Sequence, residues 1–169
     1  MADALIRPAE PRDLPAISAI YNHAVLHTTA TYDYDTEPLE RRFAWFDDHR
    51  SLDLPVLVAA RGDQVLGWGS LSPFHRRPGF QFTVENSLYI AEPYRAQGLG
   101  SALLRRLISA AERRNLRSII AAIDASNEVS VRLHQGHAFE EVGRFPSVGF
   151  KFGRWLDVVY LQRQLAREG

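Results

Sequence analysis

One stretch of this chain decides its expected fold: Val84-Glu85-Asn86-Ser87-Leu88-Tyr89-Ile90-Ala91-Glu92-Pro93-Tyr94-Arg95-Ala96-Gln97-Gly98-Leu99-Gly100-Ser101-Ala102-Leu103-Leu104. It reads as a strand, a short turn and the start of a helix. The first N–H groups of a helix have no partner within the helix, and with the positive end of the helix dipole they form a site for anions. Glycines in the turn let a ligand approach the main chain closely. The stretch therefore predicts a phosphate-binding turn, with an ionisable side chain, Glu85, in the strand before it.

Two common phosphate motifs fit this turn poorly. A loop for nucleoside triphosphates needs Gly-Lys-Ser/Thr, whereas this chain has Gly100-Ser101-Ala102 and no lysine there. A dinucleotide fingerprint needs a small residue three places after its second glycine, where this chain has Leu103. Asp124, at the end of a later strand, partly imitates the ribose-binding acid of such proteins. A dinucleotide-binding oxidoreductase therefore remains an alternative.

The composition favours one compact domain over residues 1–169, because 46% of the residues are hydrophobic. The 20 basic and 20 acidic residues cancel, which argues against nucleic acid or an anionic membrane as a partner. Without cysteine the chain has no disulfide, thiolate metal site or cysteine nucleophile. His23 and His27 are four residues apart but lack acidic or cysteine co-ligands, so we interpret them as structural and expect no metal.

Nothing in the sequence indicates a membrane segment. Residues 1–8 lack the apolar core of a signal peptide, and Pro55-Val56-Leu57-Val58-Ala59-Ala60 is too short to span a bilayer. We therefore expect a soluble protein, and the cysteine-free composition suits a cytoplasmic location.

Periodicity and turn signals predict an α/β order of elements. Strands are expected at residues 5–7, 56–60, 64–70, 82–90, 118–123, 140–148 and 155–165, and helices at about 13–26, after 36–38, from about 98 and at 127–134. Asp13 is expected to cap the first helix. The apolar run Ser118 to Ile123 predicts a central strand that is parallel to its neighbour. The polar link Thr28 to Tyr34 is a candidate substrate loop, although a plain connection is the alternative.

Several separated segments resemble one enzyme family. Arg95 to Gly100 matches the Arg/Gln-x-x-Gly-x-Gly/Ala signature of the GNAT-type N-acetyltransferases, and the chain more narrowly resembles the phosphinothricin and methionine sulfoximine N-acetyltransferases. The other matching segments are Tyr21-Asn22-His23-Ala24-Val25, Thr83-Val84-Glu85-Asn86-Ser87-Leu88-Tyr89, Ser130-Val131-Arg132-Leu133-His134 and Gly149-Phe150-Lys151-Phe152-Gly153-Arg154-Trp155-Leu156-Asp157. In one departure, Gly136-His137-Ala138-Phe139 has alanine where many relatives have glycine before the aromatic residue.

The resemblance implies a fold and a cofactor. The fold is a mixed, mostly antiparallel twisted sheet with a central splayed pair of parallel strands, flanked by about four helices. Acetyl-CoA is expected to place its pantetheine arm in the splay and its pyrophosphate on the turn. The implied cofactor-binding residues are Leu88, Tyr89, Ile90, Arg95, Ala96, Gln97, Gly98, Leu99, Gly100, Ser101, Asn127 and Ser130. The resemblance also implies a homodimer to which the C-terminal hairpin contributes.

The chemistry of amine acetylation suits two candidate catalytic residues. An amine attacks a thioester only when neutral, so a proton acceptor helps, and Glu85 is the candidate. A carboxylate with an ordinary pKa near ~4.3 is a feeble base, so burial must raise the pKa or a water must relay the proton. His134 takes the place of the family's usual tyrosine and is the candidate donor of a proton to the departing thiolate. The tetrahedral oxyanion needs aimed donors, and the resemblance implies that main-chain N–H groups around Leu88 supply them.

The expected reaction is direct transfer of acetyl to the α-amine of a small amino-acid-like substrate. Arginine pairs well with a carboxylate or phosphinate through two parallel hydrogen bonds. The candidate substrate-binding residues are Tyr32, Phe74, His75, Arg76, Arg77, Thr83 and Glu85. The alternatives are an acetyltransferase for peptide or protein N-termini and an acyl-CoA-binding module without turnover.

Overall fold

A computed structural model of the protein describes residues 4–165 and contains one seven-stranded sheet. Residues 1–3, which belong to the segment 1–8 where we expect no signal peptide, lie outside the described residues. The strands are β1 (Leu5–Pro8), β2 (Val56–Arg61), β3 (Gln64–Pro73), β4 (Thr83–Ile90), β5 (Ser118–Asp124), β6 (Glu140–Lys151) and β7 (Arg154–Gln164). The helices are α1 (Leu14–His27), α2 (Leu39–Ser51), α3 (Leu99–Arg113) and α4 (Glu128–Gln135), with short 3-10 turns at Pro11–Asp13, Pro78–Phe80 and Glu92–Tyr94.

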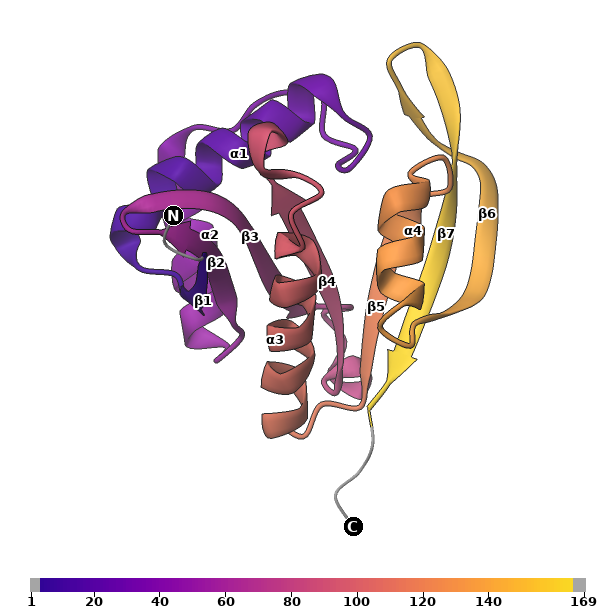
Figure 1. The fold of residues 1–169 in the computed structure, drawn as a ribbon. Coiled ribbons are helices and arrows are strands. Elements are labelled where there is room, and N and C mark those ends of the chain that lie inside the picture. The colour runs from indigo at the N-terminus through magenta and orange to yellow at the C-terminus, as the bar shows by residue number, and fades with distance from the viewer. Residues whose placement is uncertain (1–3, 166–169) are drawn as a thin grey trace.

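The sheet confirms the expected mixed topology with a splayed centre. Its strand order is β1-β2-β3-β4-β5-β7-β6, and β4 with β5 is the parallel pair among antiparallel neighbours. Pairing between β4 and β5 ends at Glu85 and Ile120, although β4 continues to Ile90 and β5 to Asp124. Figure 1 shows the two strands diverging beyond that point. Main-chain groups that would otherwise pair across the sheet therefore face each other over a gap.

Two apolar cores cover the two faces of the sheet. Alternate residues of β2 divide between them, because successive side chains of a strand point to opposite faces. Leu57 and Ala59 join a core that α3 covers, whereas Val56 and Val58 join a second core with α1 and α2. This coverage on both sides explains why β2 is a continuous apolar run rather than an alternating one.

One local expectation fails at the start of α1. Asp13 precedes the helix, but its side chain caps no helical N–H group. Instead, its two carboxylate oxygens accept hydrogen bonds from Arg7 at 2.7 and 2.8 Å, and one also accepts from the N–H group of Glu10 at 2.8 Å. A bidentate arginine is a stronger partner for a buried carboxylate than a helical N–H group. Asp13 therefore ties β1 to the turn before α1.

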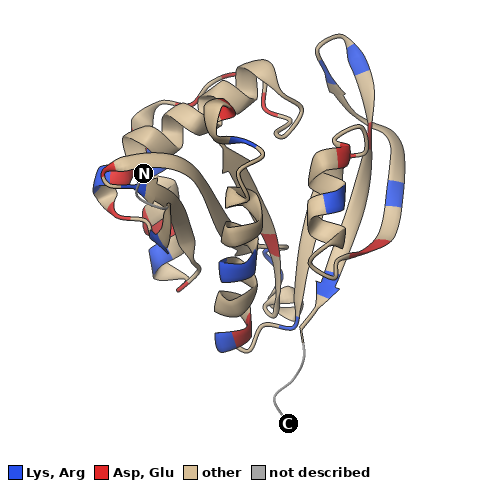
Figure 2. Ribbon diagram, viewed as in Figure 1, with Lys and Arg blue, Asp and Glu red and all other residues tan. Residues whose placement is uncertain are grey.

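Charged residues of both signs are spread over the ribbon, as Figure 2 shows. Arg105, Arg106 and Arg113 lie on the exposed side of α3, opposite the apolar side that packs on the sheet. In the part of the chain that the structure describes, no helix is both long and apolar enough to cross a membrane.

Ala138, in the turn after α4, gives a test of local strain. Its φ angle is 58°, in the left-handed region where a Cβ atom costs about 1 kcal/mol or more. We expect Ala138→Gly to raise the free energy of unfolding by about 1 kcal/mol, measured by urea denaturation. The control, Ala102→Gly within α3, should lower it by about 1 kcal/mol. Destabilisation by both changes would contradict the strain at Ala138.

Candidate active site

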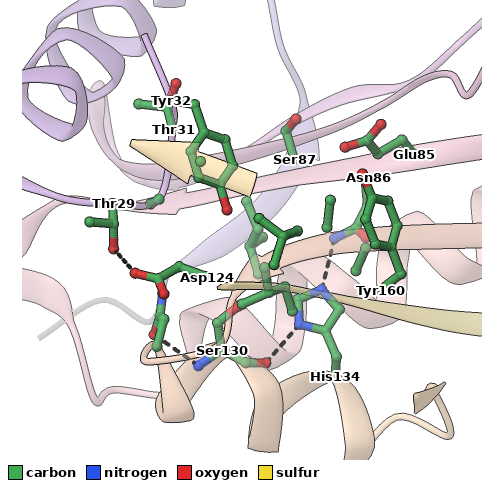
Figure 3. Close-up of a pocket in the computed structure, with 18 of the residues that line it drawn as sticks. Thr29, Thr31, Tyr32, Glu85, Asn86, Ser87, Asp124, Ser130, His134 and Tyr160 are labelled. Carbon is green, nitrogen blue, oxygen red and sulfur yellow. Dashed lines mark hydrogen bonds between the residues drawn. The ribbon is translucent and has the colours of Figure 1, made fainter. Parts of the chain in front are cut away.

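A cavity of about 500 Å³ opens where β4 and β5 part. Its volume is in the range usual for small-molecule sites. It is lined by Thr29, Ala30, Thr31 and Tyr32 before α2, by Glu85 to Tyr89 of β4, by Ala121 to Asp124 of β5, by Asn127, Ser130 and His134 at α4, and by Val148, Gly149, Val158 and Tyr160 of the last two strands. Figure 3 shows the polar members of this set converging from these elements.

The two faces of β4 contribute different side chains to the cavity. Leu88 and Ile90 pack against the core under α3, whereas Tyr89 packs against the core under α1 and α2. Because side chains alternate along a strand, Asn86 shares the α3 side with Leu88, and Glu85 shares the other side with Tyr89. Figure 3 shows Asn86 directed to His134 and Glu85 directed away from it. A ligand in the gap therefore meets Glu85 from one side and Asn86 from the other.

Glu85 has the burial that a carboxylate base requires. It lies on β4 at the last residue that pairs with β5, and it lines the cavity. Burial raises the pKa of Glu85 above its ordinary value because the ionised form loses hydration. As the pH falls, this side chain therefore gains a proton earlier than an exposed glutamate does. The higher pKa makes its ionised form a stronger base.

The turn before α3 has the backbone geometry of an anion site. Gly98, the residue before the helix, has a φ angle of 79°, which favours glycine, and Ala96 adopts 58°. The first helical bond in this region runs from the N–H group of Ala102 to the carbonyl of Gly98, so the N–H groups of residues 99–101 have no partner within the helix. A Cβ atom at Gly100 would lie 3.2 Å from Leu133 and 3.7 Å from Leu88. Gly100 therefore lets the turn pack closely beside the cavity.

The expected cofactor residues divide between the cavity and this turn. Leu88, Tyr89, Asn127 and Ser130 line the cavity, and the side chain of Asn127 caps α4 by accepting from the N–H group of Ser130 at 3.2 Å. Ile90 and the residues from Arg95 to Ser101 lie outside the cavity lining. Ser101 has a hydroxyl 2.9 Å from Nε2 of His137. The turn at residues 96–101, hereafter the anion turn, adjoins the cavity, because Leu88 lines the cavity and lies 3.7 Å from where a Cβ atom of Gly100 would be.

His134 is 2% exposed, and its hydrogen bonds fix its state. Its Nδ1 lies 2.8 Å from the carbonyl oxygen of Ser130, which only accepts, so Nδ1 carries the proton. Burial lowers the pKa of His134, so the ring is neutral near pH 7. Nε2 therefore accepts a hydrogen bond from Nδ2 of Asn86 at 3.0 Å. Donation of a proton to a thiolate would need a proton on Nε2, so these hydrogen bonds favour a positioning role.

The carboxylate of Asp124 is hydrogen-bonded to neighbouring residues. Its carboxylate accepts from the hydroxyl of Thr29, and from the N–H and hydroxyl groups of Ser126 at 3.0 and 2.9 Å. Burial alone would raise the pKa of Asp124, but these hydrogen bonds outweigh burial and hold the pKa below its ordinary value. The carboxylate thus ties the end of β5 to the loop after α1. This arrangement removes the resemblance to a ribose-binding acid.

The loop at residues 28–36 closes one side of the cavity, and the hairpin of β6 and β7 holds it there. Nζ of Lys151, a residue that is 3% exposed, donates to the carbonyl of Thr31 at 2.7 Å. The hydroxyl of Tyr34 donates to the carbonyl of Phe150 at 2.6 Å. A Cβ atom at Gly149 would lie 3.1 Å from the ring of Tyr32, so a larger residue there would require that ring to shift. These contacts give Gly149, Phe150 and Lys151 a role in holding the loop.

The predicted substrate residues are not brought together. Tyr32 and Glu85 line the cavity, but Phe74, His75, Arg76, Arg77 and Thr83 do not. Phe74 contacts the ring of Phe80 edge-on and His75 contacts it at a tilt, 5.9 and 5.0 Å between ring centres. Nδ1 of His75 accepts from the N–H group of Arg77 at 3.1 Å. The two arginines are exposed. The lining residues include the carboxylates of Glu85 and Asp124 and no lysine or arginine.

Sequence analysis did not identify several residues that line the cavity. The most polar are Thr29, Thr31, Asn86, Ser87 and Tyr160. The two threonines belong to the polar link that we singled out as a substrate loop, so the segment was detectable although the residues were not. Tyr160 comes from β7, and only the three-dimensional structure shows that this strand borders the gap. His23 and His27, which we interpreted as structural, stack on each other at 4.6 Å between ring centres, away from this cavity.

Comparison with known proteins agrees with this geometry. The Acetyltransferase (GNAT) family matches residues 17–139. An L-methionine sulfoximine/L-methionine sulfone acetyltransferase of Salmonella typhimurium is 41% identical over 160 residues, covering 95% of this chain and 94% of the relative. A phosphinothricin N-acetyltransferase of Alcaligenes faecalis is 40% identical, covering 95% of this chain and 82% of the relative. The structure of yncA from Salmonella typhimurium with its cofactor acetyl-CoA has a TM-score of 0.97 and 39% identity, covering 99% of this chain and 97% of that one.

The splayed strands and the anion turn define an acyl-CoA-dependent acyltransferase, and this chain belongs to the GNAT acetyltransferase family. Acetyl-CoA fits the residues present. The free N–H groups after Gly98 suit its diphosphate, and the unpaired edges of β4 and β5 suit the amides of its pantetheine arm. Asn86 lines the same cavity, and its Oδ1 atom is buried without a hydrogen-bond partner.

Removal of the Tyr34 hydroxyl should loosen the loop at residues 28–36 without a change in either apolar core. Tyr34→Phe removes its bond to Phe150, and we expect faster hydrogen exchange in residues 28–36 and a KM for the amine that is raised severalfold. The dissociation constant of acetyl-CoA should not change, because the anion turn is untouched. Tyr94→Phe is the matched control, since its hydroxyl accepts from Gln64 outside the cavity. Unchanged exchange in Tyr34→Phe would contradict the contact.

Proposed function

We propose that this protein transfers acetyl from acetyl-CoA to the α-amine of a small amino-acid-like substrate of the methionine sulfone, methionine sulfoximine or phosphinothricin type. The observation that carries the proposal is a half-buried Glu85 with a raised pKa, which lines the cavity at the point where β4 and β5 part. The relatives named above support the substrate class. The loop at 28–36 supports a small substrate, because it narrows the cavity that a peptide would have to enter.

The mechanism assigns separate tasks to the residues of the cavity. When bound, acetyl-CoA supplies an acetyl group that is activated as a thioester. Glu85 accepts a proton from the substrate ammonium, directly or through a water, and leaves a neutral amine for attack. A main-chain N–H group near Leu88 is the proposed donor to the developing oxyanion. Direct transfer needs no acylated residue of this chain, because Glu85 leaves a neutral amine that can attack the thioester itself, and the departing thiolate can take up the proton that the amine nitrogen then loses.

The anionic end of the substrate needs a cation that the cavity lining lacks. Arg76 and Arg77 remain our proposal for this contact, from the exposed segment between β3 and β4. They would reach the substrate at the mouth of the cavity, either in the same chain or from a partner. A cytoplasmic location, where acetyl-CoA is available, is also part of the proposal.

An amine panel with Glu85→Gln tests this function. We expect thiol release from acetyl-CoA with methionine sulfone, methionine sulfoximine or phosphinothricin, and a kcat at least about a hundredfold lower in Glu85→Gln. The dissociation constant of acetyl-CoA should stay the same. In the wild type, kcat/KM should fall as the pH drops through the raised pKa of Glu85, because protonation removes the base.

Glu92→Gln is the matched control, because Glu92 is exposed and lies outside the cavity lining. It should keep full activity. Acetylation of peptides alone would overturn the substrate class, and unchanged turnover in Glu85→Gln would overturn the base. Acetyl-CoA binding with no turnover on any amine would favour the non-catalytic alternative.

We further propose that the protein is a homodimer formed through the hairpin of β6 and β7. Six large apolar residues of this hairpin are exposed, and such a group marks an interaction surface: Val142 is 57% exposed, Phe145 55%, Val148 57%, Phe150 43%, Phe152 56% and Trp155 65%. Val148 also lines the cavity, so a partner on this surface would lie at the cavity mouth.

Sedimentation analysis tests the dimer. Trp155→Glu should shift the protein from dimer to monomer, because it would bury a charge in an apolar contact. Leu52→Glu, at a 55% exposed position on another part of the surface, should remain dimeric. A monomeric wild type at micromolar concentration would refute the proposed interface.

A further inference from the structure

One buried polar atom of the cavity lacks a hydrogen-bond partner in this structure. Oδ1 of Asn86 is buried with no partner, and the residue is 9% exposed. A buried acceptor without a donor is destabilising, because it has lost its hydrogen bonds to water and gained none in the protein. Buried unpaired groups are rare in folded proteins, so each calls for an explanation. Asn86 lines the gap between β4 and β5, where a bound ligand can supply the missing donor.

The orientation of this amide is fixed by its neighbours. Ser130 accepts from Nδ1 of His134, which leaves Nε2 as an acceptor. Nε2 of His134 accepts a hydrogen bond from Nδ2 of Asn86 at 3.0 Å. If the amide were flipped, Oδ1 would face the lone pair of Nε2 and the contact would become repulsive. The neutral ring therefore directs Oδ1 away from itself.

The position of Asn86 on β4 indicates which ligand supplies the donor. Asn86 shares the α3 side of the strand with Leu88, and the anion turn lies on that side. Glu85, the proposed base for the amine, lies on the opposite side of the strand. The pantetheine arm of acetyl-CoA carries two secondary amides, and each has one N–H group to donate. The amine of the substrate approaches from the side of Glu85.

We propose that Oδ1 of Asn86 accepts a hydrogen bond from an amide N–H group of the pantetheine arm, and that His134 is a positioning residue which aims this oxygen. The inference rests on the use of acetyl-CoA by this site. It gives His134 a task that needs no proton transfer. It also explains why a neutral, buried histidine stands on α4 next to the gap.

Asn86→Leu gives the sharpest test, because leucine has a similar size and needs no hydrogen-bond partner. We expect binding of acetyl-CoA, measured by calorimetry, to weaken about tenfold, which is the loss of one neutral hydrogen bond. Binding of adenosine 3′,5′-bisphosphate, which lacks the pantetheine arm, should not change. The urea midpoint should change little, because the variant removes one unpaired acceptor, Oδ1 of Asn86, and leaves another, Nε2 of His134, without its donor. Asn86→Ala is the second variant and should show the same ligand pattern.

Three results would overturn the proposal. Equal weakening of both ligands, or a lower urea midpoint with unchanged binding, would make Asn86 a structural residue only. A higher KM for the amine with unchanged acetyl-CoA binding would mean that Oδ1 of Asn86 accepts its hydrogen bond from the amine substrate and not from the pantetheine arm. A wild-type protein that fails to bind acetyl-CoA would instead refute the proposed function, so the two failures are distinguishable.

Variants of His134 separate positioning from proton transfer. His134→Ala should weaken acetyl-CoA binding as Asn86→Leu does, whereas His134→Gln should restore most of the affinity because its side-chain oxygen can accept from Asn86. The double variant Asn86→Leu with His134→Ala should be no weaker than either single variant. A proton donor would behave differently: both His134 variants would lose kcat and keep full affinity for acetyl-CoA. That outcome would overturn the positioning role.

Discussion

The whole site depends on the loss of pairing between β4 and β5 after Glu85 and Ile120. A parallel pair in the middle of a sheet normally continues, because unpaired main-chain groups in the interior are costly. Here each strand keeps its other neighbour, β3 for β4 and β7 for β5, so both remain ordered while they diverge. The gap thus presents main-chain donors and acceptors of a rigid framework to a ligand, which takes the place of the missing strand.

Contacts on both sides of the sheet span this gap. On the α3 side, His134 of α4 accepts from Asn86 of β4, while α4 itself packs on β5 and β7. On the other side, the loop after α1 binds both strands, because Tyr89 donates to the carbonyl of Ala30 at 3.3 Å and Thr29 donates to Asp124. The hairpin of β6 and β7 holds the same loop through Lys151. The width of the gap is therefore set by side chains, and the ligand meets a preformed space.

Local sequence signals predicted the parts of the site that depend on local geometry. The turn with a helix starting near Gly98, the short helix that begins near Asn127 and the buried run of β5 each follow from residues that are neighbours in the chain. The resemblance to a family added the splay and Glu85, and the strand pairing confirms the splay. What sequence could not supply were contacts between distant segments. The partners of Asp124, the fit of Tyr32 against Gly149 and the place of Tyr160 all depend on strands far apart in the chain. Arg76 and Arg77 show the same limit, because an arginine in a suitable segment need not face the cavity.

Hydrogen exchange with and without acetyl-CoA tests the central claim most directly, because it reports on the unpaired main chain itself. If the pantetheine arm replaces the missing strand pairing, acetyl-CoA should slow exchange at residues 86–90 and 121–124, together with the turn at 96–101. Residues 56–73 of β2 and β3, which are already paired on both sides, should exchange at unchanged rates. Slowing at the turn alone, with no change on the facing edges of β4 and β5, would contradict the account.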